Sequence, residues 1–126
     1  MEFYRCKECG NIVVFMNENH PVIPLCCGTR MQLLKANTTD GAAEKHVPVP
    51  EVEERAIHVS VGSIFHPMAE EHFIEFVVLE TDRGFQKVNL LPGEVPQCIF
   101  ALTEGEVPQA VYAYCNLHGL WKAEVE

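Results

Sequence analysis

Nine cysteine and histidine side chains fall into two groups whose residue types and spacing suit metal binding. One group contains only cysteines, a Cys-x-x-Cys pair and an adjacent pair: Cys6, Cys9, Cys26 and Cys27. The other combines four histidines with one cysteine: His46, His66, His72, Cys115 and His118. Four thiolates suit a closed tetrahedral iron or zinc site, whereas imidazoles with one thiolate suit a transition metal that keeps a position open for chemistry. Both kinds of site in one small chain indicate an electron-handling enzyme.

The cysteine quartet is the stronger signal, because two close cysteine pairs in one short segment are seldom accidental. Two disulfides are the alternative, and the spacing does not choose between iron and zinc. Each histidine taken alone is as easily structural as ligating. His58 alternates with apolar neighbours on a predicted strand and is expected to face solvent, and His20 is expected to be a turn residue.

Composition narrows the class of protein. A chain of 126 residues with 48% hydrophobic residues has room for one domain, or for a small metal-stapled module and a second domain. No apolar run approaches the roughly 18 residues of a membrane span, and the first residues do not resemble a signal peptide. We therefore expect a cytoplasmic protein, in which clustered cysteines are more often metal ligands than disulfides. Cys98 remains outside both groups, as a predicted core thiol.

The formal net charge of −9 argues against nucleic acid as a partner, because nucleic-acid-binding proteins usually carry a basic patch. The same charge repels an anionic substrate. Such a substrate would need local positive charge at the site, and Lys45, next to His46, offers it together with the metal.

The pattern of apolar residues predicts an all-β protein. Short strands around the cysteines are expected at 11–16 and 31–34, within a metal-binding module of residues 1–36. A polar linker is expected at 37–45, followed by a domain of residues 46–126. About seven strands separated by turn residues favour an immunoglobulin-like antiparallel sandwich in this domain. They are expected at 46–50, 55–61, 73–81, 85–91, 97–103, 109–115 and 119–125. No segment shows helical periodicity, although 68–71 could form a single turn.

These motifs together resemble desulfoferrodoxin, the two-iron form of superoxide reductase, over nearly the full length of the chain. The resemblance rests on five motifs. They are Cys6-x-x-Cys9 with Cys26-Cys27-Gly28, Glu44-Lys45-His46-Val47-Pro48, His66-Pro67-Met68, Glu71-His72, and Cys115-Asn116-Leu117-His118-Gly119-Leu120-Trp121. Glu70 departs from the pattern, since a lysine is expected there. It changes the charge near the site without replacing a ligand.

The resemblance implies two iron ions per chain. A desulforedoxin-like module would bind the first through Cys6, Cys9, Cys26 and Cys27. The second would have His46, His66, His72 and His118 in a plane with Cys115 axial. The family's activity would be the one-electron reduction of superoxide to hydrogen peroxide, with rubredoxin or a similar small protein as donor and a homodimer as the assembly. Lys45 would attract the anion and help to deliver protons, and Glu44 would occupy the sixth position of ferric iron.

Two other functions remain open from the residues themselves. An electron-transfer or structural metal-binding module would use only the cysteine quartet, and the Cys115–His118 motif speaks against it. A dismutase would have to oxidise superoxide as well, which a thiolate-ligated site that favours reduction makes unfavourable.

Overall fold

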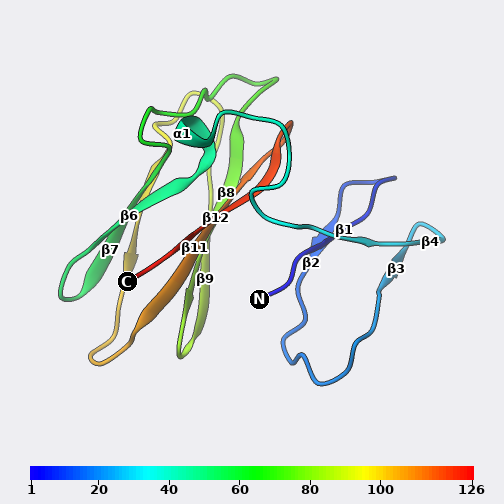
Figure 1. Ribbon diagram of the computed structural model, residues 1–126, viewed down its shortest axis with the longest axis horizontal. Coiled ribbons are helices and arrows are strands. Elements are labelled where there is room, and N and C mark those ends of the chain that lie inside the picture. Colours follow the sequence, from blue (N-terminus) through cyan, green and yellow to red (C-terminus); the bar gives the residue numbers. More distant parts are fainter. The chain divides into compact units, whose positions relative to one another are not determined.

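The computed structural model describes all residues, 1–126, and the chain divides into two compact units, Met1–Lys35 and Ala36–Glu126 (Figure 1). Nearly all regular structure is strand, so the all-β prediction is confirmed. The single helix, α1 (Ala43–His46), is one turn long. No helix has the length and apolar character needed to cross a membrane.

The first unit consists of very short strands around the four cysteines. These strands are β1 (Tyr4–Arg5), β2 (Ile12–Val13), β3 (Leu25–Cys26), β4 (Thr29–Arg30) and β5 (Gln32–Leu33). They form an antiparallel sheet in the order β2-β1-β5 and a β3-β4 hairpin. The core is small, with Tyr4, Cys6 and Met31 buried and packed together. Strands β2 and β5 lie within predicted segments, whereas the other three were not predicted.

The second unit is a sandwich of two antiparallel sheets. Its strands are β6 (Pro48–Val52), β7 (Ala56–Val61), β8 (Ile74–Thr81), β9 (Gly84–Asn89), β10 (Gln97–Ala101), β11 (Pro108–Cys115) and β12 (Gly119–Glu124). One sheet has the order β10-β7-β6 and the other the order β12-β11-β8-β9. All seven correspond to the strands expected from the sequence. Figure 1 shows them in colours from green to red.

The core of the sandwich follows from alternation along the strands. In β7, Ile57, Val59 and Val61 are buried, while His58 and Ser60 point to the other side and are half-exposed. Opposite them, β8 and β11 contribute apolar side chains such as Leu79 and Val111 to the same cluster. Burial of these side chains stabilises the fold by about 25 cal/mol for each Å² of apolar surface removed from water. His58 is half-exposed as expected, and its Nε2 lies 3.1 Å from a Glu53 carboxylate oxygen.

One end of the sandwich collects the ends of five strands. There β6, β8 and β12 begin, and β7 and β11 end, because each antiparallel neighbour runs the opposite way. The register is close, since Pro48 pairs with Val61 and Cys115 pairs with both Ile74 and Gly119. Side chains next to these strand ends therefore meet in space, although they are spread over more than 70 positions in the chain.

The helical turn lies at α1 and not at 68–71. In the latter segment, Ala69 and His72 exchange backbone N–H···O bonds of 3.0 and 3.1 Å, which closes a tight turn. An isolated helical turn is unstable in water. Here α1 is held because the Ile64 N–H and the Ser63 hydroxyl both donate to the Glu44 carbonyl, at 2.9 and 3.3 Å. Gly62 lies directly against this turn, where an added Cβ would be 2.7 Å from the Lys45 carbonyl oxygen.

Candidate metal centres

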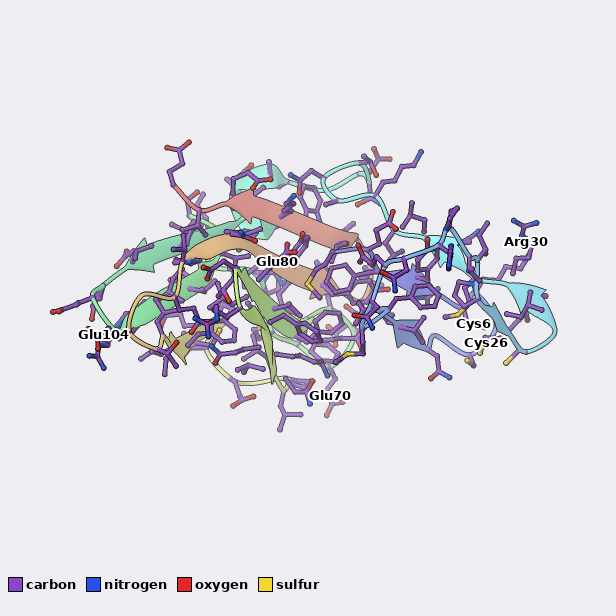
Figure 2. All side chains as sticks on the ribbon, turned by 90° about the horizontal axis from the view of Figure 1, so that it is seen from below. Cys6, Cys26, Arg30, Glu70, Glu80 and Glu104 are labelled. Atoms are coloured by element: carbon purple, nitrogen blue, oxygen red, sulfur yellow. The ribbon has the colours of Figure 1, made fainter.

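The four cysteines of the first unit converge on one point. The Cys9 and Cys26 sulfurs are 3.6 Å apart, those of Cys26 and Cys27 are 4.0 Å apart, and all four lie within 4.8 Å of one another. Figure 2 shows the sulfurs of Cys6 and Cys26 in this unit. A disulfide requires about 2.05 Å, and all four cysteines are free. Sulfurs bound tetrahedrally at about 2.3 Å would lie about 3.8 Å apart, so the quartet fits a metal ion.

Backbone conformation allows the adjacent cysteines to face one ion. Cys27 has a φ of 52° and Gly28 a φ of 74°, which turns the chain sharply directly after the second pair. Gly10, with a φ of 82°, makes the corresponding turn after the first pair.

Without a metal, the quartet cannot ionise completely. The backbone N–H of Cys9 is the main cause that lowers the pKa of Cys6, to about 7. Hydrogen bonding to Cys9 and to the other neighbouring sulfurs raises the pKa of Cys27 to about 12. A bound cation must therefore displace protons, which makes metal binding at this site dependent on pH.

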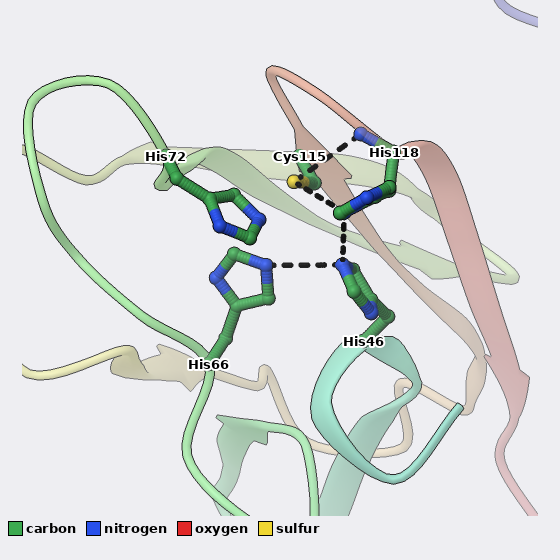
Figure 3. Close-up of side chains that lie close together, drawn as sticks. All are labelled: His46, His66, His72, Cys115 and His118. Carbon is green, nitrogen blue, oxygen red and sulfur yellow. Dashed lines mark hydrogen bonds between the residues drawn. The ribbon is translucent and has the colours of Figure 1, made fainter. Parts of the chain in front are cut away.

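The second group lies at the end of the sandwich where the five strands meet (Figure 3). His46 ends α1, His66 and His72 come from the β7–β8 connection, Cys115 ends β11, and His118 comes from the β11–β12 connection. Their candidate ligand atoms lie within 4.8 Å of one another. His46 and His66 are each 2% exposed and Cys115 is 0% exposed, so the group is largely shielded from water.

Hydrogen bonds fix the tautomers of two rings. The Nδ1–H of His46 donates to the Ala42 carbonyl at 2.7 Å, and that of His66 donates to the Pro67 carbonyl at 2.6 Å. In a neutral imidazole each Nε2 then carries only a lone pair. Burial is the main cause that lowers the pKa of both rings, to about 4 for His66, so both are neutral at pH 7.

The arrangement leaves lone pairs facing one another. The two Nε2 atoms of His46 and His66 are 3.1 Å apart, although neither has a proton to donate. The His46 Nε2 also lies 3.0 Å from the His118 Nδ1, and the His72 Nε2 is buried without any partner. Nitrogens bound at about 2.1 Å on neighbouring corners of a square would be about 3.0 Å apart. A cation between the rings satisfies all of these atoms, so the residues fit a metal.

The thiol of Cys115 completes the group. Its sulfur lies 3.9 Å from the His118 Nδ1 and accepts the His118 backbone N–H at 3.4 Å. Burial raises the pKa of Cys115, while the N–H groups of His118 and Leu117 act in the opposite direction. These N–H groups would stabilise a metal-bound thiolate.

Packing outside the ligands holds two of the rings. The Trp121 ring stacks on His46 with centroids 4.8 Å apart, and its Nε1–H donates to the His118 carbonyl at 3.1 Å. The Thr39 hydroxyl donates to the same carbonyl. Gly41 lies against both imidazoles, since an added Cβ would be 3.1 Å from His46 Cε1 and 3.3 Å from His118 Cγ. Such outer contacts orient metal ligands.

Glu44 and Lys45 lie beside the group on α1, and both side chains are exposed. The charge of Lys45 contributes, after burial and the charge of His118, to the lowered pKa of His72. A cation is thus close enough to act on the ring cluster, at the surface of a chain that is otherwise acidic.

Comparison with known proteins gives a consistent result. A sequence profile of the desulfoferrodoxin family matches residues 38–124. Desulfoferrodoxin from Nitratidesulfovibrio vulgaris is 45% identical over 98% of this chain and 95% of its own length. The chain belongs to the desulfoferrodoxin family. A superoxide reductase from Pyrococcus abyssi is 34% identical over 69% of this chain and 90% of its own length.

Among solved structures, the superoxide reductase from Treponema pallidum is similar over 98% of both chains, with a TM-score of 0.81 and 32% identity. The similarity therefore covers the first unit as well as the sandwich. The family and the two residue groups fit two iron sites in this desulfoferrodoxin relative.

All nine predicted ligands lie in the two groups, and Cys98 lies in neither. The sequence motifs contain Asn116 and Trp121 but do not reveal what they contact, and they give no role to Gly41 or Gly62. The available signal was the position of Asn116 directly after Cys115, whereas Gly41 and Gly62 are not adjacent to any ligand in the sequence. Their partners depend on which strands pair, which a single sequence does not specify.

Proposed function

We propose that the protein is a superoxide reductase that reduces superoxide by one electron to hydrogen peroxide, without evolving oxygen. The observation that carries the proposal is the convergence of four imidazoles and one thiolate in one shielded group, in a chain of this family. The metal ligands would be His46, His66, His72, His118 and Cys115. Iron bound there would supply the electron, and superoxide would take up that electron and two protons.

The protein's side chains would perform the remaining tasks. The neutral rings and the Cys115 thiolate would leave a ferrous centre with a formal charge of +1, which attracts an anion despite the net charge of −9. The N–H of His118 would hold electron density on the sulfur. Lys45 would draw superoxide toward the group and deliver protons through water. Glu44 would bind at the remaining position of the oxidised centre.

The cysteine quartet would hold the second iron through Cys6, Cys9, Cys26 and Cys27. We propose a rubredoxin-like protein as electron donor and a second copy of the chain as partner. Exposed apolar side chains in the first unit support a protein contact, with Met16 83% exposed and Leu25 71% exposed. A cytoplasmic location is supported by the free thiols, which persist in a reducing compartment.

The experiment is a pulse of superoxide delivered to the reduced, iron-loaded protein, with hydrogen peroxide and oxygen measured. One peroxide for each superoxide consumed, with no oxygen, is expected. Oxygen at half the amount of superoxide would indicate a dismutase. If a protein that holds both irons does not react rapidly with superoxide, the remaining function is that of an electron-transfer module.

Lys45→Ala tests the attraction of the substrate. The bimolecular rate should fall about ten- to a hundredfold, and its dependence on ionic strength should weaken. Lys87→Ala is the control, because it changes the net charge equally on β9, where Lys87 lies over the Phe76 ring. Glu44→Ala should leave the rate nearly unchanged and alter the resting ferric spectrum. Equal rates in the Lys45 and Lys87 variants would remove Lys45 from the mechanism.

A further inference from the structure

Asn116, the residue directly after β11 and Cys115, links the β11–β12 connection to the connection that carries His72. Its side-chain Nδ2–H donates to the Glu71 carbonyl at 3.1 Å, and its Oδ1 accepts the Phe73 N–H at 3.0 Å. These two backbone groups flank His72 on either side. The backbone N–H of Asn116 also donates to the Phe73 carbonyl, at 3.2 Å. The residue that follows Cys115 therefore holds the chain immediately before and after His72.

These bonds replace a strand ladder that is interrupted at this point. The pairing of β11 with β8 shifts between Tyr114 and Cys115, so that Tyr114 pairs with Phe76 but Cys115 pairs with Ile74. Such a bulge leaves one residue unpaired and weakens the ladder. An asparagine side chain carries one carbonyl and one NH₂ group, as a peptide unit carries a carbonyl and an N–H. Asn116 thereby continues the pairing beyond the bulge, up to the residues next to His72.

His72 depends on this support more than the other imidazoles do. The Nδ1–H groups of His46 and His66 donate to backbone carbonyls, which fixes their rings. The His72 Nε2, by contrast, is buried without a partner. The backbone N–H and carbonyl of His72 bond only to Ala69, inside the same tight turn. Met68, next to this turn, is held by the Gly93 N–H at 2.7 Å, but the Asn116 bridge is the contact that joins both residues flanking His72 to the segment directly after Cys115.

We propose that Asn116 is a positioning residue that sets His72 at the correct distance from Cys115 and so retains the metal at this group. The inference rests on the proposed binding of iron by His72 and Cys115. Loss of an outer contact that orients a ligand typically reduces metal affinity 10- to 100-fold. Asn116→Asp removes the donor to Glu71 and keeps the acceptor for Phe73, whereas Asn116→Ala removes both.

Asn37 provides a matched control in the same unit. Its Nδ2–H donates to the Lys122 carbonyl at 3.1 Å, and its Oδ1 accepts the Lys122 N–H at 2.8 Å. Asn37→Asp therefore removes the same kind of bond from a different pair of segments. The comparison separates loss of an asparagine bridge in general from loss of the bridge beside His72.

The experiment measures how fast a chelator removes ferrous iron from the full-length, two-iron protein, together with the electron paramagnetic resonance spectrum of the ferric site. We expect release about 10- to 100-fold faster in Asn116→Asp and Asn116→Ala, with a changed ferric spectrum. Asn37→Asp should stay within about twofold of the wild type, with an unchanged spectrum. If Asn116→Ala does not fold, Asn116→Asp still decides, because it keeps the Phe73 bond.

Wild-type release and an unchanged spectrum in the Asn116 variants would overturn the inference, whatever their thermal stability. Equal acceleration in Asn37→Asp would overturn it as well, since the effect would then be general. Neither readout uses superoxide. A wild type that holds iron but does not reduce superoxide would refute the proposed function alone, whereas a wild type without iron at this group would refute both.

Discussion

Gly41→Ala should disturb the histidine group more than its single added methyl suggests. The new Cβ would lie 3.1 Å from His46 Cε1, 3.2 Å from Trp121 Cζ2 and 3.3 Å from His118 Cγ. All three distances are shorter than an ordinary van der Waals contact of about 3.5–4.0 Å between carbon atoms. Two of the three rings belong to predicted metal ligands, so relief of the crowding must displace a ligand or the tryptophan packed on it.

Each of the three residues is held by a hydrogen bond. The Nδ1–H of His46 is bonded to the Ala42 carbonyl at 2.7 Å, and the His118 carbonyl accepts both Thr39 and Trp121. Insertion of a methyl into a packed site of this kind costs about 1–3 kcal/mol. If the cost falls on the metal-bound arrangement, the affinity for the metal should drop roughly 5- to 150-fold, because about 1.4 kcal/mol corresponds to tenfold.

The assay is the affinity of the metal-free full-length protein for ferrous iron, measured by competition with a chelator. Trp121 is the only tryptophan of the chain and stacks on His46, so its fluorescence should report the displacement directly. Gly84→Ala is the control. Gly84 has a φ of 144°, near the 159° of Gly41, but its added Cβ meets nothing within 4 Å. Wild-type affinity and fluorescence in Gly41→Ala would refute the reasoning.

Three further predictions concern protonation, the odd cysteine and the division into units. Burial, the main cause, lowers the pKa of His66 to about 4, so the unfolded chain takes up a proton that the native metal-free protein excludes. The metal-free protein should therefore lose about 3 kcal/mol of stability at this residue as pH falls from about 6.5 to 4, measured by urea unfolding. Burial raises the pKa of Cys98 to about 11, which keeps it a thiol packed against the core. Cys98→Ala should cost about 1 kcal/mol in unfolding experiments and leave both iron spectra unchanged. Cys6→Ser should abolish the spectrum of the tetrathiolate site, while stopped-flow rates with superoxide stay near wild type; loss of the fast reaction with the second iron retained would contradict this.

The strands of the sandwich could be predicted because they are either alternating, as in β7, or continuous apolar runs, as in β8 and β11, bounded by turn residues. Ile57, Val59 and Val61 recur at every second position, and turn residues such as Asp82 and Gly84 mark the strand ends. In the first unit this signal is missing. All five strands there have two residues each, which is too short for any period to appear, and only β2 and β5 lie within apolar runs long enough to be noticed. Their geometry follows from the cysteine turns, in which Cys27 and Gly28 adopt positive φ values.

The ligand types could also be predicted, but not the contacts that orient them. Cysteine pairs and a Cys-x-x-His motif are visible in the sequence. The bridge from Asn116 to the residues around His72 depends on the pairing of β11 with β8, and on the shift at Tyr114. The turn at α1 was missed because four residues show no helical period, and because its support comes from Ile64, about 20 positions away.

The strand register explains why such scattered ligands form one group, and it also shows which ligand needs separate support. His46, Cys115 and His118 each lie within two residues of a strand end, so sheet pairing places them directly, and the Asn116 bridge extends this pairing to the residues that flank His72. His66 is the exception, five residues beyond Val61. Its backbone N–H bonds back to the Val61 carbonyl at 3.2 Å, and the neighbouring Ile64 N–H bonds to the Glu44 carbonyl at 2.9 Å. The same loop therefore positions His66 and holds the turn that presents Lys45. A change in this loop should alter metal retention and the attraction of the substrate together, whereas changes at the strand ends should alter metal retention first.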